Sequence, residues 1–331
     1  MGTANGSSPA LVRPFRARIV ALDNPQGGVA PLSLGSWPWA TIRRAVGALL
    51  AVLLCEACEE ATSPPSPPAD TSELRELDEL STAQRRVFLK GFPGDWRADT
   101  AMARDLPEPA AGLPVPAGAR VIELPAGSDL ATGDVTVADA IARRRSLREF
   151  SDGPLSLDEL SFLLSATQGI THTERDESGA VTQQFRAAPS GGGRYPLETF
   201  LAVQRVEGLE PGLYRYLPTQ HDLLVVREDA AIGTALRQAC YDNPVVADAA
   251  LVFIWAAVPE RTEWKYGCIA HKMVAIEAGH VCQNLYLASE SVGVGTCAML
   301  GYHQPAMDAL IGADGGDLFT IYLGAVGKPA P

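Results

Sequence analysis

The chain has 331 residues, enough for one large domain or two small ones, and 47% of them are hydrophobic, which can supply a substantial core. Its formal net charge is −12, and such an acidic protein is not expected to bind nucleic acid, whose phosphates attract basic surfaces. The 6 cysteines are scattered, and the CxxC pair of Cys55 and Cys58 has no second pair, so we predict no metal site.

Composition divides the chain into five segments. Residues 1–36 are rich in glycine, proline and alanine, which indicates disorder or an over-extended translation start. A signal-like hydrophobic segment follows at 37–60, and a linker rich in proline and serine at 61–75. A lead-in segment covers residues 76–130, and a globular domain is predicted at 131–331.

The hydrophobic segment has the features of an export signal. Arg43 and Arg44 precede an uninterrupted apolar run, Ala45–Cys55, which has the length of a signal-peptide core and is too short to span a bilayer. If residues 43–58 are an export signal, the protein is tethered to the membrane or periplasmic. If they form an N-terminal hydrophobic helix instead, we expect a cytoplasmic protein.

A basic cluster follows the first predicted helix of the domain. The segment Val135–Arg143 is predicted as a helix, with Thr136 as N-cap and Asp139 at capping-box spacing. Three arginines and a serine come next: Arg144, Arg145, Ser146 and Arg148. The planar fork of arginine matches pairs of phosphate oxygens, so the cluster is suited to hold a phosphate monoester. The alternative is a solvated basic face at a helix C-terminus.

The elements after this cluster alternate between helices and strands. A helix is predicted at 157–166, begun by Ser156 with Glu159 at capping-box spacing. The others are a strand at 199–206, a hairpin at 212–227, a helix at 232–240, a buried strand at 249–258, a long helix at 272–289 and a strand at 318–326. This order predicts an α+β fold with a mixed central sheet. Since the long helix also carries apolar residues outside its main stripe, we expect it to be buried on most sides, as at a dimer core.

Two glycine-rich segments interrupt these elements. In Phe185–Glu198, two prolines bracket a turn with Ser190 and three glycines, where backbone N–H groups could approach a flat or anionic ligand closely. In Ser291–Cys297, Gly293 and Gly295 suggest a similar approach. The alternatives are a flexible surface loop for the first segment and a glycine helix cap for the second.

Six motifs in this order resemble the nitroreductase superfamily, and most closely its SagB/ThcOx-type dehydrogenases. They are RRSLR at 144–148, SLDELSFLLSATQGI at 156–170, RAAPSGGGRYPLE at 186–198, VEGLEPGLYRY at 206–216, KYG at 265–267 and EAGHVCQNLYLASESVGVG at 277–295. The lead-in RVFLKGFPGD, at 86–95, also resembles the segment that precedes the flavin domain in that group. The resemblance implies a nitroreductase-like fold, with helices flanking the central sheet, and a homodimer with FMN at its interface.

The resemblance also assigns residues to the cofactor. It places Arg144, Ser146 and Arg148 on the FMN phosphate, with Arg145 alongside, and Lys328 is the only late cation that could join them. It places ring and ribityl contacts at Pro189, Ser190, Gly191 and Gly192 of the second subunit, and at Gly293, Gly295 and Thr296.

Lys265 and Tyr266 are the candidate catalytic residues. In the azoline-oxidising relatives such a pair looks like the base that removes a carbon-bound proton while hydride goes to FMN, and a lysine serves near neutral pH only if its pKa is lowered. The alternative is a surface lysine beside a packing tyrosine. Two positions depart from the relatives: Ile269 stands where an arginine is frequent, and Asn243 where a glutamine is common.

The expected function is therefore an FMN-dependent dehydrogenase that converts the azoline of a heterocyclised peptide, or a related small molecule, to an azole. One rival is a reductase of nitro, quinone or enone compounds with NAD(P)H as electron donor. A second rival, from another class, is a tethered flavin-binding module without turnover. The substrate class and the electron donor or acceptor are left open by the sequence.

Overall fold

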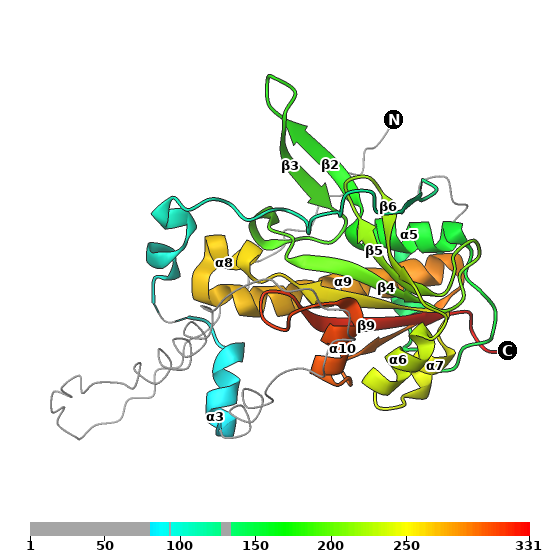
Figure 1. Cartoon of the computed structure of the whole chain (residues 1–331). Coiled ribbons are helices and arrows are strands. Elements are labelled where there is room, and N and C mark those ends of the chain that lie inside the picture. Colours follow the sequence, from blue (N-terminus) through cyan, green and yellow to red (C-terminus); the bar gives the residue numbers. More distant parts are fainter. Residues whose placement is uncertain (1–79, 93, 127–133) are drawn as a thin grey trace, which may run out of the picture. The chain divides into compact units, whose positions relative to one another are not determined.

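The computed structural model describes residues 80–92, 94–126 and 134–331, which belong to one compact unit (Figure 1). The predicted segments at 1–36, 37–60 and 61–75, including the candidate export signal, lie outside the described residues. Within the described part of the chain, no helix is long and apolar enough to cross a membrane.

The centre of the fold is a seven-stranded sheet in the order β1-β6-β5-β4-β7-β9-β8, in which all neighbouring strands are antiparallel. Its strands are β1 (Val121–Glu123), β4 (Leu197–Val203), β5 (Gly212–Leu217), β6 (Asp222–Glu228), β7 (Leu251–Ala257), β8 (Gly295–Met299) and β9 (Phe319–Gly327). With the helices that pack on it, the sheet confirms the predicted α+β class, although its named strands are antiparallel throughout and not mixed as expected.

Strand β7 shows that both faces of the sheet are covered, as its apolar sequence indicates. All seven of its residues are buried. Phe253 and Trp255 point into one hydrophobic cluster, and Val252 and Ile254 point into a second cluster on the opposite face. Because side chains alternate across a strand, an unbroken apolar run is the pattern of a strand that is covered twice.

Two groups of helices cover these faces (Figure 1). One cluster contains residues of α5 (Leu157–Gln168) and α9 (Ala270–Val292), and the other contains residues of α6 (Ile232–Ala239), α7 (Pro244–Asp248) and α10 (Gln304–Ile311). The predicted helices are therefore present, with α9 extended at both ends. Its predicted stripe is buried, whereas Ile276 on another face of the helix is 48% exposed.

The predicted helix starts are confirmed by their caps. In α4 (Val137–Arg143), the Thr136 side chain accepts from the backbone N–H of Asp139. In α5, Ser156 accepts from the Glu159 N–H, and the Glu159 side chain accepts from the Ser156 N–H. Both capping interactions satisfy N–H groups that a helix leaves unpaired at its start.

Several elements were missed by the sequence patterns. The separate hairpin of β2 (Ile170–Arg175) and β3 (Val181–Arg186) projects away from the sheet (Figure 1). Its residues are mostly polar and exposed, so they show no strong hydrophobic alternation. The short helix α8 (Glu260–Tyr266) and the 3₁₀ turn η6 (Gly267–Ile269) follow β7 and were also missed.

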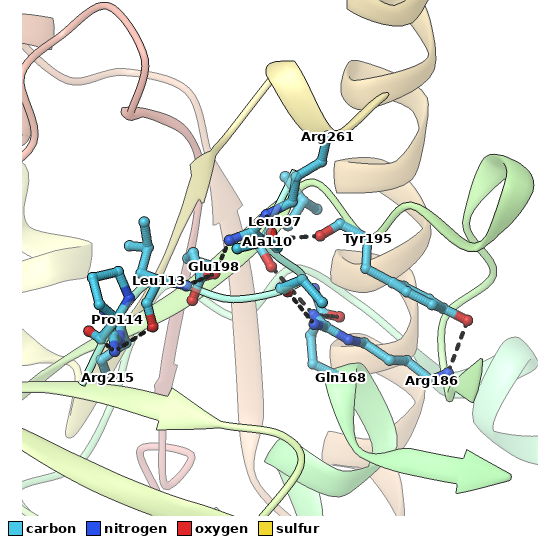
Figure 2. A network of polar contacts seen from close by, with 11 residues as sticks. Ala110, Leu113, Pro114, Gln168, Arg186, Tyr195, Leu197, Glu198, Arg215 and Arg261 are labelled. Atoms are coloured by element: carbon cyan, nitrogen blue, oxygen red, sulfur yellow. Dashed lines mark hydrogen bonds and ion pairs between the residues drawn. The ribbon is translucent and has the colours of Figure 1, made fainter. Parts of the chain in front are cut away.

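The lead-in is held against the domain by what we call the inner arginines: Arg186, Arg215 and Arg261 (Figure 2). Arg261 donates to the carbonyl oxygen of Ala110 at 2.9 Å, and Arg215 donates to those of Leu113 (3.1 Å) and Pro114 (2.9 Å). Arg186 donates to the Ala111 carbonyl at 3.5 Å. Removing the lead-in would leave buried guanidinium donors unpaired, which makes this segment part of the domain structure.

A single carboxylate completes this network. Glu198 lies 2.5 Å from Arg261 Nη2, with side chains only 7% and 2% exposed, and it also accepts from the Leu113 N–H at 3.0 Å. The remaining donors of the inner arginines go mainly to carbonyl oxygens, as Figure 2 shows. Buried charges of this kind are tolerated because they are paired and hydrogen-bonded.

Candidate functional site

The basic motif lies between the end of α4 and strand β8. Ser146 forms a parallel bridge with Thr296, and the Leu147 N–H donates to the Thr296 carbonyl at 3.0 Å. The Ser146 hydroxyl lies 2.9 Å from Tyr286 Oη, which also accepts from the Ala298 N–H. The backbone of the motif is thus attached to β8, and its serine is attached to α9.

The three arginines of this motif, called the outer arginines (Arg144, Arg145 and Arg148), remain largely solvent-accessible. The Arg144 guanidinium lies over the Tyr286 ring, 5.1 Å from its centroid. Arg145 donates to the carbonyl oxygens of residues 142, 143 and 144, and Arg148 to that of Ser146. Among the described residues, none of the three forms an ion pair with a carboxylate.

Arg148 also influences its buried neighbour Cys297. Burial raises the pKa of the Cys297 thiol, and the positive charge of Arg148 partly opposes that rise. The second effect means that the charge of Arg148 acts on a residue of β8. Since none of these three guanidinium groups has a carboxylate partner among the described residues, the outer arginines stay candidates to hold an anion on this acidic protein.

In the second glycine segment, the space beside Gly295 is filled by a side chain of the protein. A Cβ atom at Gly295 would come within 2.0 Å of the Leu147 side chain, so this glycine makes room for Leu147. Gly293 has φ +68° and ends α9 as a left-handed cap, in agreement with the alternative interpretation. The Thr296 hydroxyl is buried and lies 2.6 Å from Ser289 Oγ. Roles for these three residues in cofactor binding stay predictions.

Lys328 lies at the end of β9 and is paired with an acid. Its ammonium group forms an ion pair with Glu159, the same carboxylate that caps α5. Its carbonyl oxygen accepts from the Ser151 N–H at 2.9 Å. A role for Lys328 on a phosphate stays a prediction, and it would require this ion pair to be shared or broken.

The first glycine segment forms a loop against α8 and α9. A Cβ atom at Gly192, where φ is +63°, would lie 2.5 Å from Tyr266 Oη and 3.1 Å from Lys265 Nζ. At Gly191 it would lie 2.2 Å from the Met273 methyl carbon. A side chain at Gly192 would meet Tyr266 and Lys265, and one at Gly191 would meet Met273, so both positions favour glycine.

The structure therefore brings Ser190, Gly191 and Gly192 together with Lys265 and Tyr266, although 73 or more positions separate them in the sequence. Ser190 Oγ accepts from the Tyr195 N–H at 2.8 Å, which closes the turn, and Pro189 precedes it on the surface. The Lys265 ammonium lies 5.9 Å from the Tyr266 ring centroid. We call this group the glycine-loop site: residues 190–193, Lys265, Tyr266, Met273 and Glu277.

Glu277 is a member of this site that sequence reasoning did not assign. Its side chain accepts from the Gly191 N–H at 2.9 Å although the residue is only 6% exposed. Burial raises the pKa of Glu277, while hydrogen bonds from Gly191 and Ser190 oppose the rise. Its place in the EAGH motif was visible in the sequence, but the contact to the loop depends on how α9 packs.

Helix α9 connects the two groups of residues. Glu277 contacts the glycine loop, and Tyr286 contacts Ser146 and Arg144. Nine positions along an α-helix correspond to about 14 Å, so one rigid element sets the axial spacing between the two groups. The described residues contain no group of three or more metal-ligating side chains.

Comparison with known proteins identifies the fold and the family. The Nitroreductase family model matches residues 141–328, which is more than half of the chain. The protein MJ1384 of Methanocaldococcus jannaschii, which bears the name of a nitroreductase, is 38% identical over 171 residues, covering 52% of this chain and 81% of that protein. The crystal structure of a protein of Ralstonia eutropha, also named as a nitroreductase, matches with a TM-score of 0.53 and 27% identity, covering 68% of this chain and 95% of that chain.

A more distant relative bears a different name. The trifolitoxin-processing protein TfxB of Rhizobium leguminosarum is 28% identical over 145 residues, which cover 42% of this chain. The matched region spans only 38% of the length of TfxB. With the antiparallel sheet, the helices on both faces and the family match over residues 141–328, the chain belongs to the nitroreductase family of oxidoreductases.

Proposed function

We propose that the protein is an FMN-dependent dehydrogenase that oxidises an azoline, in a heterocyclised peptide or a related small molecule, to an azole. The observation that carries the proposal is the contact between the glycine loop and the Lys265–Tyr266 pair. The relative named for processing trifolitoxin supports a substrate that is modified by the enzyme rather than a simple electron acceptor.

The residues present fit FMN. The outer arginines offer guanidinium groups that no carboxylate of the described chain neutralises, as a phosphate site requires. The glycine loop offers a backbone without side chains, which suits a flat ring, and the loop that meets the ring would belong to the second subunit. Arg144, Ser146 and Arg148 would hold the phosphate, with Arg145 beside them, and residues 189–192 would lie against the ring.

When bound, FMN would accept the hydride from the substrate carbon. The protein must then take the proton from a second carbon of the azoline, so that the ring loses two hydrogens in total and gains a double bond. Lys265 Nζ would take this proton in its neutral form, and Tyr266 Oη would orient the substrate or relay the proton. Both groups come from one short helix, which places them at one side of the loop.

We infer that the working form is a homodimer in which the loop of the second subunit completes each FMN site. An exposed face of α9 supports this inference: Ile276 is 48% exposed, and a Cβ atom at Gly279 would meet open space. Both residues lie on a face of α9 that the described residues leave uncovered, so this face has room for the helix of a second subunit.

The rival function is an NAD(P)H-dependent reductase of nitro, quinone or enone compounds. It is favoured by the names of MJ1384 and of the Ralstonia protein. In both comparisons, the matched region covers most of the relative's own length. Such a reductase needs hydride exchange with the flavin, and it does not need a base for a carbon-bound proton. The two functions therefore differ in their dependence on Lys265.

The experiment compares wild type, Lys265→Met and the control Lys90→Met on FMN-loaded protein. Each is tested with a thiazoline-containing peptide, by the loss of two hydrogens in mass spectrometry, and with NADPH, by bleaching of the flavin. We expect Lys265→Met to lose azoline oxidation by at least about a hundredfold while FMN content stays at the wild-type level, and Lys90→Met to retain both. Azoline oxidation that survives in Lys265→Met would overturn the assigned base. Bleaching by NADPH without azoline oxidation in wild type would favour the reductase, and protein that binds no FMN would exclude both.

A further inference from the structure

The lead-in touches the predicted catalytic tyrosine. Trp96 belongs to the 3₁₀ turn η2 (Trp96–Asp99), and its ring lies against that of Tyr266, with the centroids 5.3 Å apart and the planes at 38°. Trp96 is half-buried by this packing. Aromatic pairs at this spacing are attractive beyond the area that they bury.

The lead-in also contacts the neighbours of Tyr266. Trp264 Nε1 donates to the Leu106 carbonyl at 2.8 Å. Gly267 has φ +52° and ψ −132° at the break between α8 and η6, and a Cβ atom there would lie 3.6 Å from the Thr100 methyl group and 3.8 Å from the Trp96 carbonyl oxygen. The turn that follows the tyrosine is therefore packed under the lead-in.

The glycine loop lies on another side of the same tyrosine. Cβ atoms at Gly192 and Gly191 would lie 2.5 Å from Tyr266 Oη and 3.9 Å from its Cε2. The tyrosine is thus contacted by the lead-in and by the loop, and Trp96 is the lead-in side chain that lies against its ring. With Trp96 removed, the ring would be free to turn about its side-chain torsions on that side.

We propose that the lead-in is part of the catalytic site and that Trp96 is a positioning residue, which holds the Tyr266 ring so that its hydroxyl group faces the glycine loop. This inference rests on the proposed function of Tyr266 in catalysis. It assigns a role in the reaction to residues 96–106, which precede the segment matched by the family model. A misplacement of about 1 Å at a reacting group can cost about a hundredfold in rate.

The test compares Trp96→Ala, the conservative variant Trp96→Phe and the control Phe88→Ala, whose side chain lies on the lead-in and is 50% exposed. In the full-length, FMN-loaded protein, we expect Trp96→Ala to lower kcat about 10- to 100-fold with little change in KM and in FMN content. Trp96→Phe should restore most of the kcat, and Phe88→Ala should match wild type. Unchanged kcat in Trp96→Ala would overturn the proposal, as would a joint loss of FMN and folded protein in both Trp96 variants.

A second measurement needs no turnover and separates this inference from the proposed function. Tetranitromethane nitrates accessible tyrosines, and peptide mass spectrometry would give the rate at Tyr266 relative to that at Tyr241, which is 65% exposed. We expect the relative rate at Tyr266 to rise several-fold in Trp96→Ala and to stay near wild type in Trp96→Phe. An unchanged relative rate would show that Trp96 does not hold the ring, even if wild type proves inactive on azolines.

Discussion

The inner and the outer arginines are the same residue type in two opposite situations. Arg215 and Arg261 are 6% and 1% exposed. Both donate to carbonyl oxygens of the lead-in and Arg261 pairs with Glu198, while the buried Arg215 Nε has no partner among the described residues. Arg145 and Arg148 are exposed and donate only to nearby carbonyl oxygens. The difference teaches that the partners of an arginine, rather than its presence in a motif, separate a structural role from a binding role.

The largest effect is expected from breaking the inner network. Arg261→Met removes the ion-pair partner of buried Glu198, and we expect the free energy of unfolding to fall by about 3–5 kcal/mol, because a buried charge is then left uncompensated. Urea denaturation followed by circular dichroism measures this change. Arg145→Met is the matched control, expected to stay within about 0.5 kcal/mol of wild type. If Arg261→Met lowers the free energy of unfolding by less than about 1 kcal/mol, the inner arginines do not stabilise the fold more than the outer arginines do.

The next effect concerns the outer arginines and the cofactor. We expect Arg144→Gln and Arg148→Gln each to raise the Kd for FMN about 10- to 100-fold, since a hydrogen bond to a charged group contributes about 1.5–3 kcal/mol. Their unfolding midpoints should match wild type. Titration of apoprotein, followed by quenching of flavin fluorescence, gives the Kd. Arg145→Gln should have a smaller effect, because its guanidinium already serves the carbonyls at the end of α4. Equal Kd values in wild type and both variants would remove the phosphate assignment.

The smallest expected effect is that of salt on the inner and the outer arginines. Exposed charges are screened at high ionic strength, whereas buried pairs are screened much less. Between about 0.1 and 1 M NaCl, we expect the Kd for FMN to rise several-fold in wild type. The stability difference between wild type and Arg261→Met should stay nearly constant over the same range. If this difference shrinks as the Kd rises, the inner network is more solvated than its burial indicates.

Much of the frame could be predicted from local patterns. The caps at Thr136 and Ser156, and the unbroken apolar run of β7, each follow from chemistry within a few residues. The hairpin of β2 and β3 could not be predicted in this way, because its strands are largely solvated and carry polar residues on both faces. For Gly293, the alternative prediction from the sequence was a helix cap, and the structure confirms that cap.

The site divides in the same manner. The basic motif and the Lys265–Tyr266 pair are contiguous in sequence, and the family resemblance indicated them. Glu277 and Trp96 depend on contacts between segments far apart in the chain, so no local pattern assigns them. The packing of Leu147 against Gly295 is likewise a contact that no local pattern predicts, and the role of Gly295 toward a ligand stays a prediction.

The place of β9 in the sheet has a consequence for how the chain reaches this fold. Strand β9 pairs with β7 and β8, yet α8, α9 and α10 all lie between β7 and β9 in the sequence. During synthesis, one edge of β7 therefore stays unpaired until those helices have been made, and its residues LVFIWAA are a segment prone to intermolecular strand pairing. Slow completion of a sheet by distant strands favours aggregation of the nascent protein. Low temperature and slow expression should therefore favour the yield of soluble protein.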